Sequence, residues 1–179
     1  MKQVLLFVLL GSVITIHAQS HKNAGIVGKE IQGNFTGTNK KETARTMIVM
    51  NGMNTSTGID RTKAEYIVAF QGRNVPDIMI KGYESILVNE GDLNGDGMDE
   101  LSVYSAPLHG CTYIMTTYTF SQGKWKEFIP SFLIPTACEN LTDDEIQGKV
   151  FKEGKKVYFY ETDLNSEDFI QGRKEVNVK

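Results

Sequence analysis

The sequence predicts an all-β protein, and two features of its 179 residues carry this prediction. Short runs rich in Val, Ile, Tyr, Phe and Thr alternate with clusters of Gly, Asn, Asp and Ser, which is the pattern of strands separated by turns. Only one short stretch has a helix signal. Hydrophobic residues make up 40% and charged residues 23% of the chain, as in ordinary globular proteins, so we expect one packed domain.

The first nineteen residues have the pattern of a secretory signal peptide. Lys2 precedes an apolar stretch from Val4 to Ile16, and small or neutral residues follow near Ala18 and Gln19. The stretch is shorter than a membrane-spanning helix requires. We therefore expect residues 1–19 to be removed and residues 20–179 to form a single β-rich domain that is periplasmic, secreted or at the cell surface, without membrane insertion.

Two hairpins and one helical turn are the clearest local features. Each predicted hairpin turn contains a glycine, Gly123 or Gly154, where a tight turn needs an unusual backbone angle. Thr142 and Glu145 form a capping-box pattern at the start of a short helix over Leu141–Gln147. The predicted strands are Gly25–Ile31, Thr43–Met50, Ala64–Phe70, Asp77–Lys81, Ser85–Val88, Glu100–Tyr104, Thr112–Phe120, Trp125–Ile129, Lys149–Lys152 and Lys156–Glu161.

An internal repeat organises these strands. Residues 33–44 (GNFTGTNKKETA) lie without gaps over residues 91–102 (GDLNGDGMDELS). Each copy follows one predicted strand and precedes three more, which is the layout of a four-stranded propeller blade. We expect antiparallel blade-like units near 25–81 and 85–132, with an incomplete third unit from about Gly148. A closed propeller needs at least four blades, so the chain is expected to protect its sheet edges in another way. It could form a small sandwich or an incomplete propeller, cover its edges with the irregular segments 51–62 and 130–144, or pair with another copy, and we expect a monomer.

The second copy of the repeat carries the strongest site signal. Its acidic and amide side chains alternate, and a glycine at the sixth position permits a sharp turn. Oxygen ligands at alternate positions of such a loop suit Ca²⁺. The expected ligands are Asp92, Asn94, Asp96, the backbone carbonyl of Met98, and Glu100. Asp99 lies between ligand positions and is expected to face solvent.

This loop resembles the calcium loops of FG-GAP or VCBS-type repeats, which occur in integrin-like β-propellers and in many bacterial exported proteins. Their hallmark, D-x-[DN]-x-D-G-x-x-[DE], matches residues 92–100 with Glu where Asp is more usual. The resemblance implies one Ca²⁺, held at the five positions named above, and an exported bacterial protein. The first copy has Asn34, Thr36 and Thr38 at the corresponding ligand positions, so we expect no metal there.

The only two cysteines, Cys111 and Cys138, are expected to form a disulfide, in keeping with export. The alternative is that Cys111, two residues after His109, is a catalytic nucleophile. The chain has no zinc-ligand cluster, G-x-S-x-G elbow or phosphate-binding glycine loop. These absences favour a non-enzymatic module over an enzyme.

The formal net charge of −3 offers no electrostatic footprint for nucleic acid. The leading functional hypothesis is therefore an exported calcium-binding module, monomeric, with an unidentified protein or polysaccharide partner. Two alternatives remain open. One is a small secreted hydrolase that uses the acidic loop and its metal. The other is a carbohydrate-binding module that uses Trp125 and neighbouring tyrosines.

Overall fold

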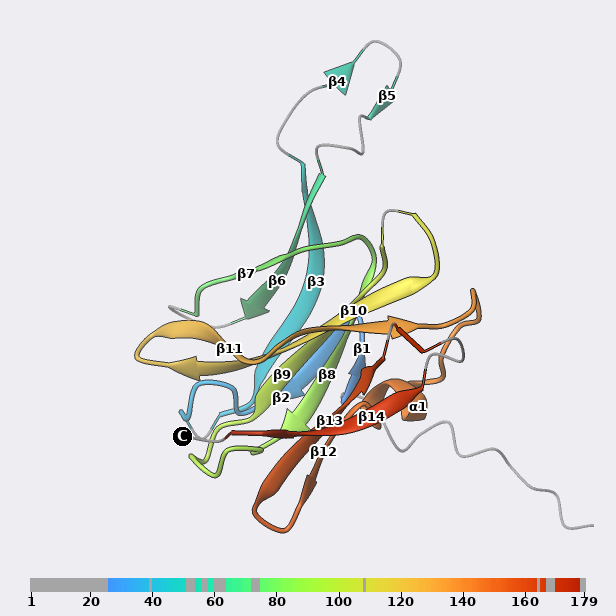
Figure 1. The fold of residues 1–179 in the computed structure, drawn as a ribbon. Coiled ribbons are helices and arrows are strands. Elements are labelled where there is room, and N and C mark those ends of the chain that lie inside the picture. Colours follow the sequence, from blue (N-terminus) through green and yellow to red (C-terminus); the bar gives the residue numbers. More distant parts are fainter. Residues whose placement is uncertain are drawn as a thin grey trace, which may run out of the picture.

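The computed structural model describes residues 26–177, apart from 39, 51–53, 56–57, 60–63, 72–74, 108, 164 and 167–169. The predicted signal peptide lies outside these residues. The described chain is nearly all β, with antiparallel sheets that do not close on themselves and one short helix (Figure 1). This confirms the all-β prediction and its blade-like, sandwich-like form.

The first unit is a four-stranded antiparallel sheet in sequential order. Beyond β3 and β6, two short strands pair as Asn54 with Ile59 and Thr55 with Gly58, and they project from the rest of the protein (Figure 1). Segment 51–62 was expected to be irregular, and this hairpin ladder corrects that expectation for its described residues. The strands of this unit are β2 (Glu30–Gly33), β3 (Glu42–Met50), β6 (Ala64–Gln71) and β7 (Ile78–Ile80), with β4 (Asn54–Thr55) and β5 (Gly58–Ile59) at the tip.

The second unit repeats this layout and gains one strand from the start of the described chain. Its meander consists of β8 (Ser85–Gly91), β9 (Glu100–Ser105), β10 (Thr112–Ser121) and β11 (Lys124–Pro135), and β1 (Val27–Gly28) pairs with the free edge of β8. The main sheets of the first two units share one order, with one strand, the repeated loop and then three more strands; the β4–β5 hairpin is an addition to the first. Gln122 and Gly123 have φ of 56° and 75° in the β10–β11 turn, as the predicted hairpin requires.

Two strand predictions need correction. The single strand expected over residues 25–31 is two strands in different sheets, because Val27 pairs with Val88 whereas Ile31 pairs with Ala44. The intervening Gly28 has φ of 149°, which favours glycine and lets the chain change sheets. β11 also continues into the segment expected to be irregular, since burial of Phe132 and Ile134 extends the strand to Pro135.

The third unit begins with helix α1 (Asp143–Gln147), which has the predicted Thr142–Glu145 capping box. Its sheet contains β12 (Val150–Glu153), β13 (Lys156–Thr162) and β14 (Gln171–Val176). The strand pattern did not predict β14, because its residues from Gln171 to Glu175 are exposed. Ion pairs from Arg173 to Glu153, Lys174 to Glu161 and Lys156 to Glu175 accompany its pairing with β13.

The second sheet is the middle layer of the protein. Leu87, Leu101 and Val103 pack with the first sheet, whereas Val88, Tyr104 and Met115 pack with α1 and the third unit. All six residues of β9 are consequently buried, including the carboxyl group of Glu100. Glu100 begins β9 at the end of the repeated loop, so this layer positions the candidate site.

Candidate metal centre

The loop of residues 92–99 is built on its own aspartate side chains. Asp92 Oδ1 accepts a hydrogen bond from the backbone N–H of Gly95 (2.6 Å), and its Oδ2 accepts one from Gly97 (3.0 Å). Asp96 Oδ1 likewise accepts from the N–H of Met98 (2.9 Å). Gly95 and Gly97 have φ of 85° and 87°, a conformation that other residues adopt only with strain. The loop therefore turns tightly, as the motif predicts.

Glu100 closes the loop from beneath. Its side chain has no exposed surface, and its Oε2 accepts hydrogen bonds from the N–H groups of Leu93 (2.7 Å) and Asn94 (3.2 Å). The Nδ2 of Asn94 donates to Glu100 Oε1 (2.7 Å) and to Asp96 Oδ2 (3.1 Å). It also lies 3.2 Å from the hydroxyl of Thr119, a neighbour on β10 that the motif did not reveal.

Three of the predicted side-chain ligands thus converge, because the amide of Asn94 lies between the carboxylates of Asp96 and Glu100. Asp92 instead binds the loop backbone with both oxygens. Met98 is half-buried and lies against the first loop, since a Cβ built on Gly37 would be 3.2 Å from Met98 Cγ. Among the described residues, no group of three or more His, Cys, Asp and Glu side chains is arranged to hold a metal.

The donor set nevertheless suits Ca²⁺ in its chemistry. Each carboxylate oxygen can accept a backbone hydrogen bond and still offer a lone pair. The carbonyl oxygen of Asn94 accepts a hydrogen bond from the N–H of Asp96 (2.8 Å). Rotation of the amide would exchange this hydrogen bond for a carbonyl oxygen between the two carboxylates. The residues would then present only oxygens at that point, as hard cations require.

Burial raises the pKa of two carboxyl groups at this end of the sheet. Desolvation raises the pKa of Glu100 to about 7, opposed by hydrogen bonds from Thr119, Leu93 and Asn94 and reinforced by the Asp96 carboxylate. Desolvation also raises the pKa of Glu90 to about 8, with Ser102 lowering it and Glu100 raising it further. Both groups therefore resist ionisation unless a positive charge compensates them.

The raised pKa of Glu100 predicts that the metal-free protein loses stability as the pH rises. Because folding favours the protonated carboxyl, the stabilisation is fully present below the ordinary pKa of 4.5 and is lost through about 7. This difference corresponds to at most about 3 kcal/mol. Urea unfolding in EDTA between about pH 5 and about pH 8.5 measures it. Glu100→Gln should reduce the pH dependence and leave the share that Glu90 contributes, whereas the exposed control Glu139→Gln should leave the pH dependence unchanged. Stability that rises over this range would contradict the prediction.

The first copy of the repeat has the same frame without the acidic loop. Glu42 Oε2 accepts from the N–H of Phe35 (2.8 Å), as Glu100 does from Leu93. Its Oε1 accepts from the hydroxyls of Thr36 and Thr38, the latter at 2.9 Å. Threonine hydroxyls therefore satisfy the buried carboxylate of the first copy, where the second copy uses Asn94.

Asp99 was expected to face solvent, but its side chain is hydrogen-bonded within the protein. Its Oδ2 accepts hydrogen bonds from the N–H of Asn34 (2.8 Å) and from Asn89 Nδ2 (3.1 Å), and its own N–H donates to Asn34 O (2.9 Å). Asn34 Nδ2 also donates to Gly97 O (2.8 Å). Asp99 thus joins the two repeated loops. No local pattern distinguishes this role, because its partner is 65 residues away.

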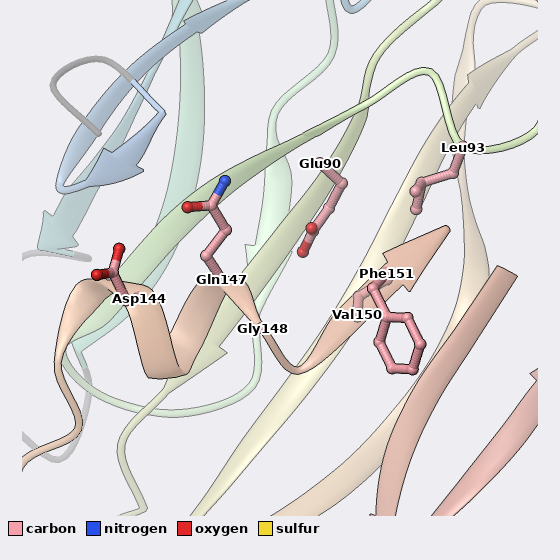
Figure 2. Close-up of a pocket in the computed structure, with 7 residues that line it drawn as sticks. All are labelled: Glu90, Leu93, Asp144, Gln147, Gly148, Val150 and Phe151. Atoms are coloured by element: carbon pink, nitrogen blue, oxygen red, sulfur yellow. The ribbon is translucent and has the colours of Figure 1, made fainter. Parts of the chain in front are cut away.

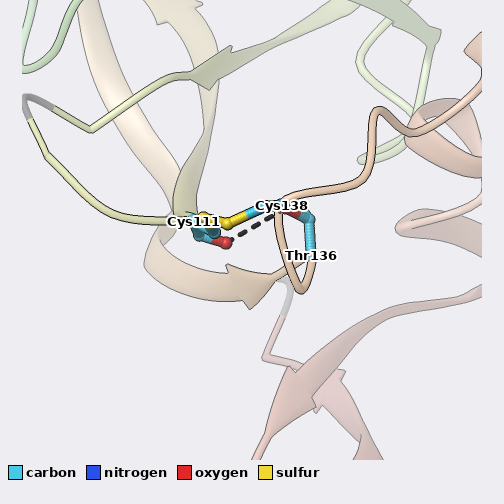
Figure 3. Close-up of a disulfide and its surroundings, with 3 residues drawn as sticks. All are labelled: Cys111, Thr136 and Cys138. Atoms are coloured by element: carbon cyan, nitrogen blue, oxygen red, sulfur yellow. Dashed lines mark hydrogen bonds between the residues drawn. A yellow bond between two sulfur atoms is a disulfide. The ribbon is translucent and has the colours of Figure 1, made fainter.

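The predicted disulfide is present. Cys111 and Cys138 are bonded with their Cα atoms 4.7 Å apart, which excludes the alternative of a free nucleophilic Cys111 in this state. The adjacent Thr136 donates from its N–H (2.9 Å) and its hydroxyl (3.1 Å) to Cys111 O (Figure 3).

Trp125 is engaged within the protein. Its ring stacks on Phe70 at a centroid distance of 4.8 Å and meets Phe35 and Phe120 edge-on, and its Nε1 donates to Pro76 O (2.9 Å). A sugar-binding ring needs an open face, so this arrangement does not favour the carbohydrate-binding alternative.

Comparisons with protein-family models, curated proteins and solved structures gave no match to this chain. The part of the chain that the structure describes contains no helix of the length and hydropathy that a membrane span requires. The chemistry of the loop itself is therefore the basis for assigning a function.

Proposed function

We propose that this protein is an exported, non-enzymatic binding module whose 92–100 loop holds one structural Ca²⁺. The observation that carries the proposal is the position of the Asn94 side chain between the carboxylates of Asp96 and Glu100. The resemblance of the loop to FG-GAP or VCBS-type calcium loops supports the same choice of metal. A bound Ca²⁺ would supply the positive charge that the clustered carboxylates lack.

A structural role is supported by the position of the loop between all three units. Asp99 connects it to Asn34 of the first unit, and Lys152 Nζ of the third unit donates to Asp92 O (2.9 Å). Ordering this loop would therefore strengthen contacts on both sides of the middle sheet. This is the expected benefit of a metal bound by the folded state.

The wider assignment follows from the same features. A disulfide suits an oxidising compartment, and the signal-like segment 1–19 directs the chain to the periplasm, the cell surface or the medium. We propose a monomer that binds a protein or polysaccharide rather than nucleic acid.

Calcium titration by calorimetry and thermal unfolding tests this proposal. We expect one Ca²⁺ per chain with a Kd of about 10⁻⁴ to 10⁻³ M, as in other extracellular modules. At one hundred times Kd, binding should stabilise the protein by about 2.7 kcal/mol. Asp92→Ala and Asp96→Ala should abolish both the heat and the stabilisation.

Asp77→Ala is the matched control, because Asp77 is an exposed carboxylate outside the loop. It should bind Ca²⁺ as the parent protein does. Absence of heat and of thermal stabilisation in the parent protein would refute the calcium proposal, and equal stabilisation of all four proteins would locate the cation elsewhere.

A metal-dependent hydrolase is the second candidate, because a hollow of about 660 Å³ adjoins the loop at Asn94 and Asp96. A catalytic metal there would need a coordination position open to this hollow. Water-proton relaxation with Mn²⁺ in place of Ca²⁺ distinguishes the two candidates. Rapidly exchanging metal-bound water, together with cleavage of nitrophenyl esters, would favour the hydrolase, whereas a closed coordination shell would favour the structural role.

A further inference from the structure

Glu90 is placed differently from the other residues of β8. Asn89 pairs with Leu101 and Gly91 pairs with Glu100, so Glu90 is the extra residue of a β-bulge. Bulges redirect side chains and are common beside functional sites. Here the bulge directs a carboxyl group from the middle sheet toward the turn between α1 and β12 (Figure 2).

A hollow of about 350 Å³ lies at this place. This volume is at the lower end for small-ligand sites. Leu93, Val150 and Phe151 form its apolar lining, and Gln147 at the end of α1 adds an amide (Figure 2). The hollow therefore combines an apolar wall with a few polar groups.

The carboxyl of Glu90 is incompletely satisfied in this hollow. Its Oε1 is fully enclosed and has no hydrogen-bond partner in the described part of the chain. No Lys, Arg or His is among the lining residues that the structure describes. Lys149 lies between Gly148 and Val150 in the chain, but its Nζ is directed to Gln171 Oε1 (3.4 Å). The hollow thus offers a carboxyl acceptor without a cationic donor among its described lining residues.

We propose that this hollow binds an alkylammonium group, which donates to Glu90 Oε1 while its methylene chain packs on Leu93, Val150 and Phe151. The group could belong to a free amine or to a lysine side chain of a partner, because both present the same chemistry. A charged N–H donor is the strongest complement to an enclosed carboxylate. The inference does not depend on calcium, because none of these contacts involves the ligands proposed for the 92–100 loop.

NMR titration of the ¹⁵N-labelled protein with butylamine hydrochloride tests the site. We expect shifts concentrated at the amides of Glu90, Gly148 and Val150, with a Kd on the order of 1 mM, as suits a ligand of so few atoms. Butanol has the same alkyl chain without the charge and should cause no such shifts. Equal binding of butanol, or shifts centred elsewhere, would overturn the proposal.

A second titration with Nα-acetyl-lysine N-methylamide identifies the source of the group. Binding of this compound alone supports a peptide lysine, binding of butylamine alone supports a free amine, and binding of both supports the ammonium site itself. Absence of binding by either compound overturns the proposal. Each titration is performed with Ca²⁺ and with EDTA, so binding in EDTA supports the site even if the calcium proposal fails.

Substitutions then assign the contact. Glu90→Gln should weaken binding at least about ten-fold, since it removes the charge that pairs with the ammonium group. Phe151→Ala, which removes part of the apolar wall at a half-buried position, provides a second variant if Glu90→Gln does not fold, and should weaken binding several-fold. Glu139→Gln removes an exposed carboxylate and should leave binding unchanged. Unchanged affinity in Glu90→Gln, or in Phe151→Ala where it alone folds, would refute the assigned contacts.

Discussion

Replacement of Phe35 with alanine is expected to destabilise the protein by about 3 to 5 kcal/mol. Phe35 has no exposed surface, and its ring lies 6.0 Å from that of Phe70 and 6.4 Å from that of Trp125. Removal of the ring would leave a cavity between the first and second sheets. Phe35 belongs to the first repeated loop, and its N–H donates to Glu42. The cavity would therefore adjoin this loop.

Urea unfolding measures this loss, and fluorescence of Trp125 reports it locally because Trp125 is the only tryptophan. Met47→Ala on β3 is the matched control, since Met47 is 46% exposed. A change within about 0.5 kcal/mol is expected there. If Phe35→Ala were no more harmful than Met47→Ala, the first loop would not be anchored by this ring.

Removal of the disulfide is expected to cost about 3 to 4 kcal/mol. Cys111 and Cys138 are separated by 27 positions, and a crosslink closing a loop of this length restricts the unfolded chain by about that free energy on the chain-entropy model. The crosslink lies at the end of the β10–β11 ladder, where Thr112 pairs with Pro135. We expect Cys111→Ser combined with Cys138→Ser to keep the fold but to unfold at lower denaturant concentration.

The reductant dependence provides the control for this prediction. Dithiothreitol should lower the unfolding midpoint of the parent protein toward that of the double variant and should leave the double variant unchanged. An unaltered midpoint after complete reduction would show that the crosslink adds little to the free energy of unfolding. Such a result would exclude the disulfide as a major contributor to the stability of the protein.

Much of the architecture could be predicted from local pattern. Alternating hydrophobic residues identified the strands of both meanders. Gly123 marked the β10–β11 turn, Gly154 marked the β12–β13 turn of the third unit, and Thr142 marked the start of α1. The repeat was detectable because the two loops share one hydrogen-bonded frame. In that frame a glutamate seven residues downstream accepts the N–H of Phe35 or Leu93.

The candidate site was predictable only in part. The spacing of Asp92, Asn94, Asp96 and Glu100 placed them in one tight loop. It could not show that Asn94 lies between two carboxylates or that Asp92 uses both oxygens on the loop backbone. These hydrogen bonds depend on side-chain rotamers and on Thr119 from a neighbouring strand.

The all-β class, the repeated units, the cysteine pair and the acidic loop were thus predictable, because each depends on residue types at short or regular spacing. The remaining features arise from long-range packing. β14 has no buried face to produce an alternating pattern, and its ion pairs join residues far apart in the chain. Asp99 acquires its partner from a loop 65 residues away, and Glu90 faces a hollow formed by α1 and β12. These roles arise only when distant strands pack, because their energies depend on burial and on partners that no local segment contains.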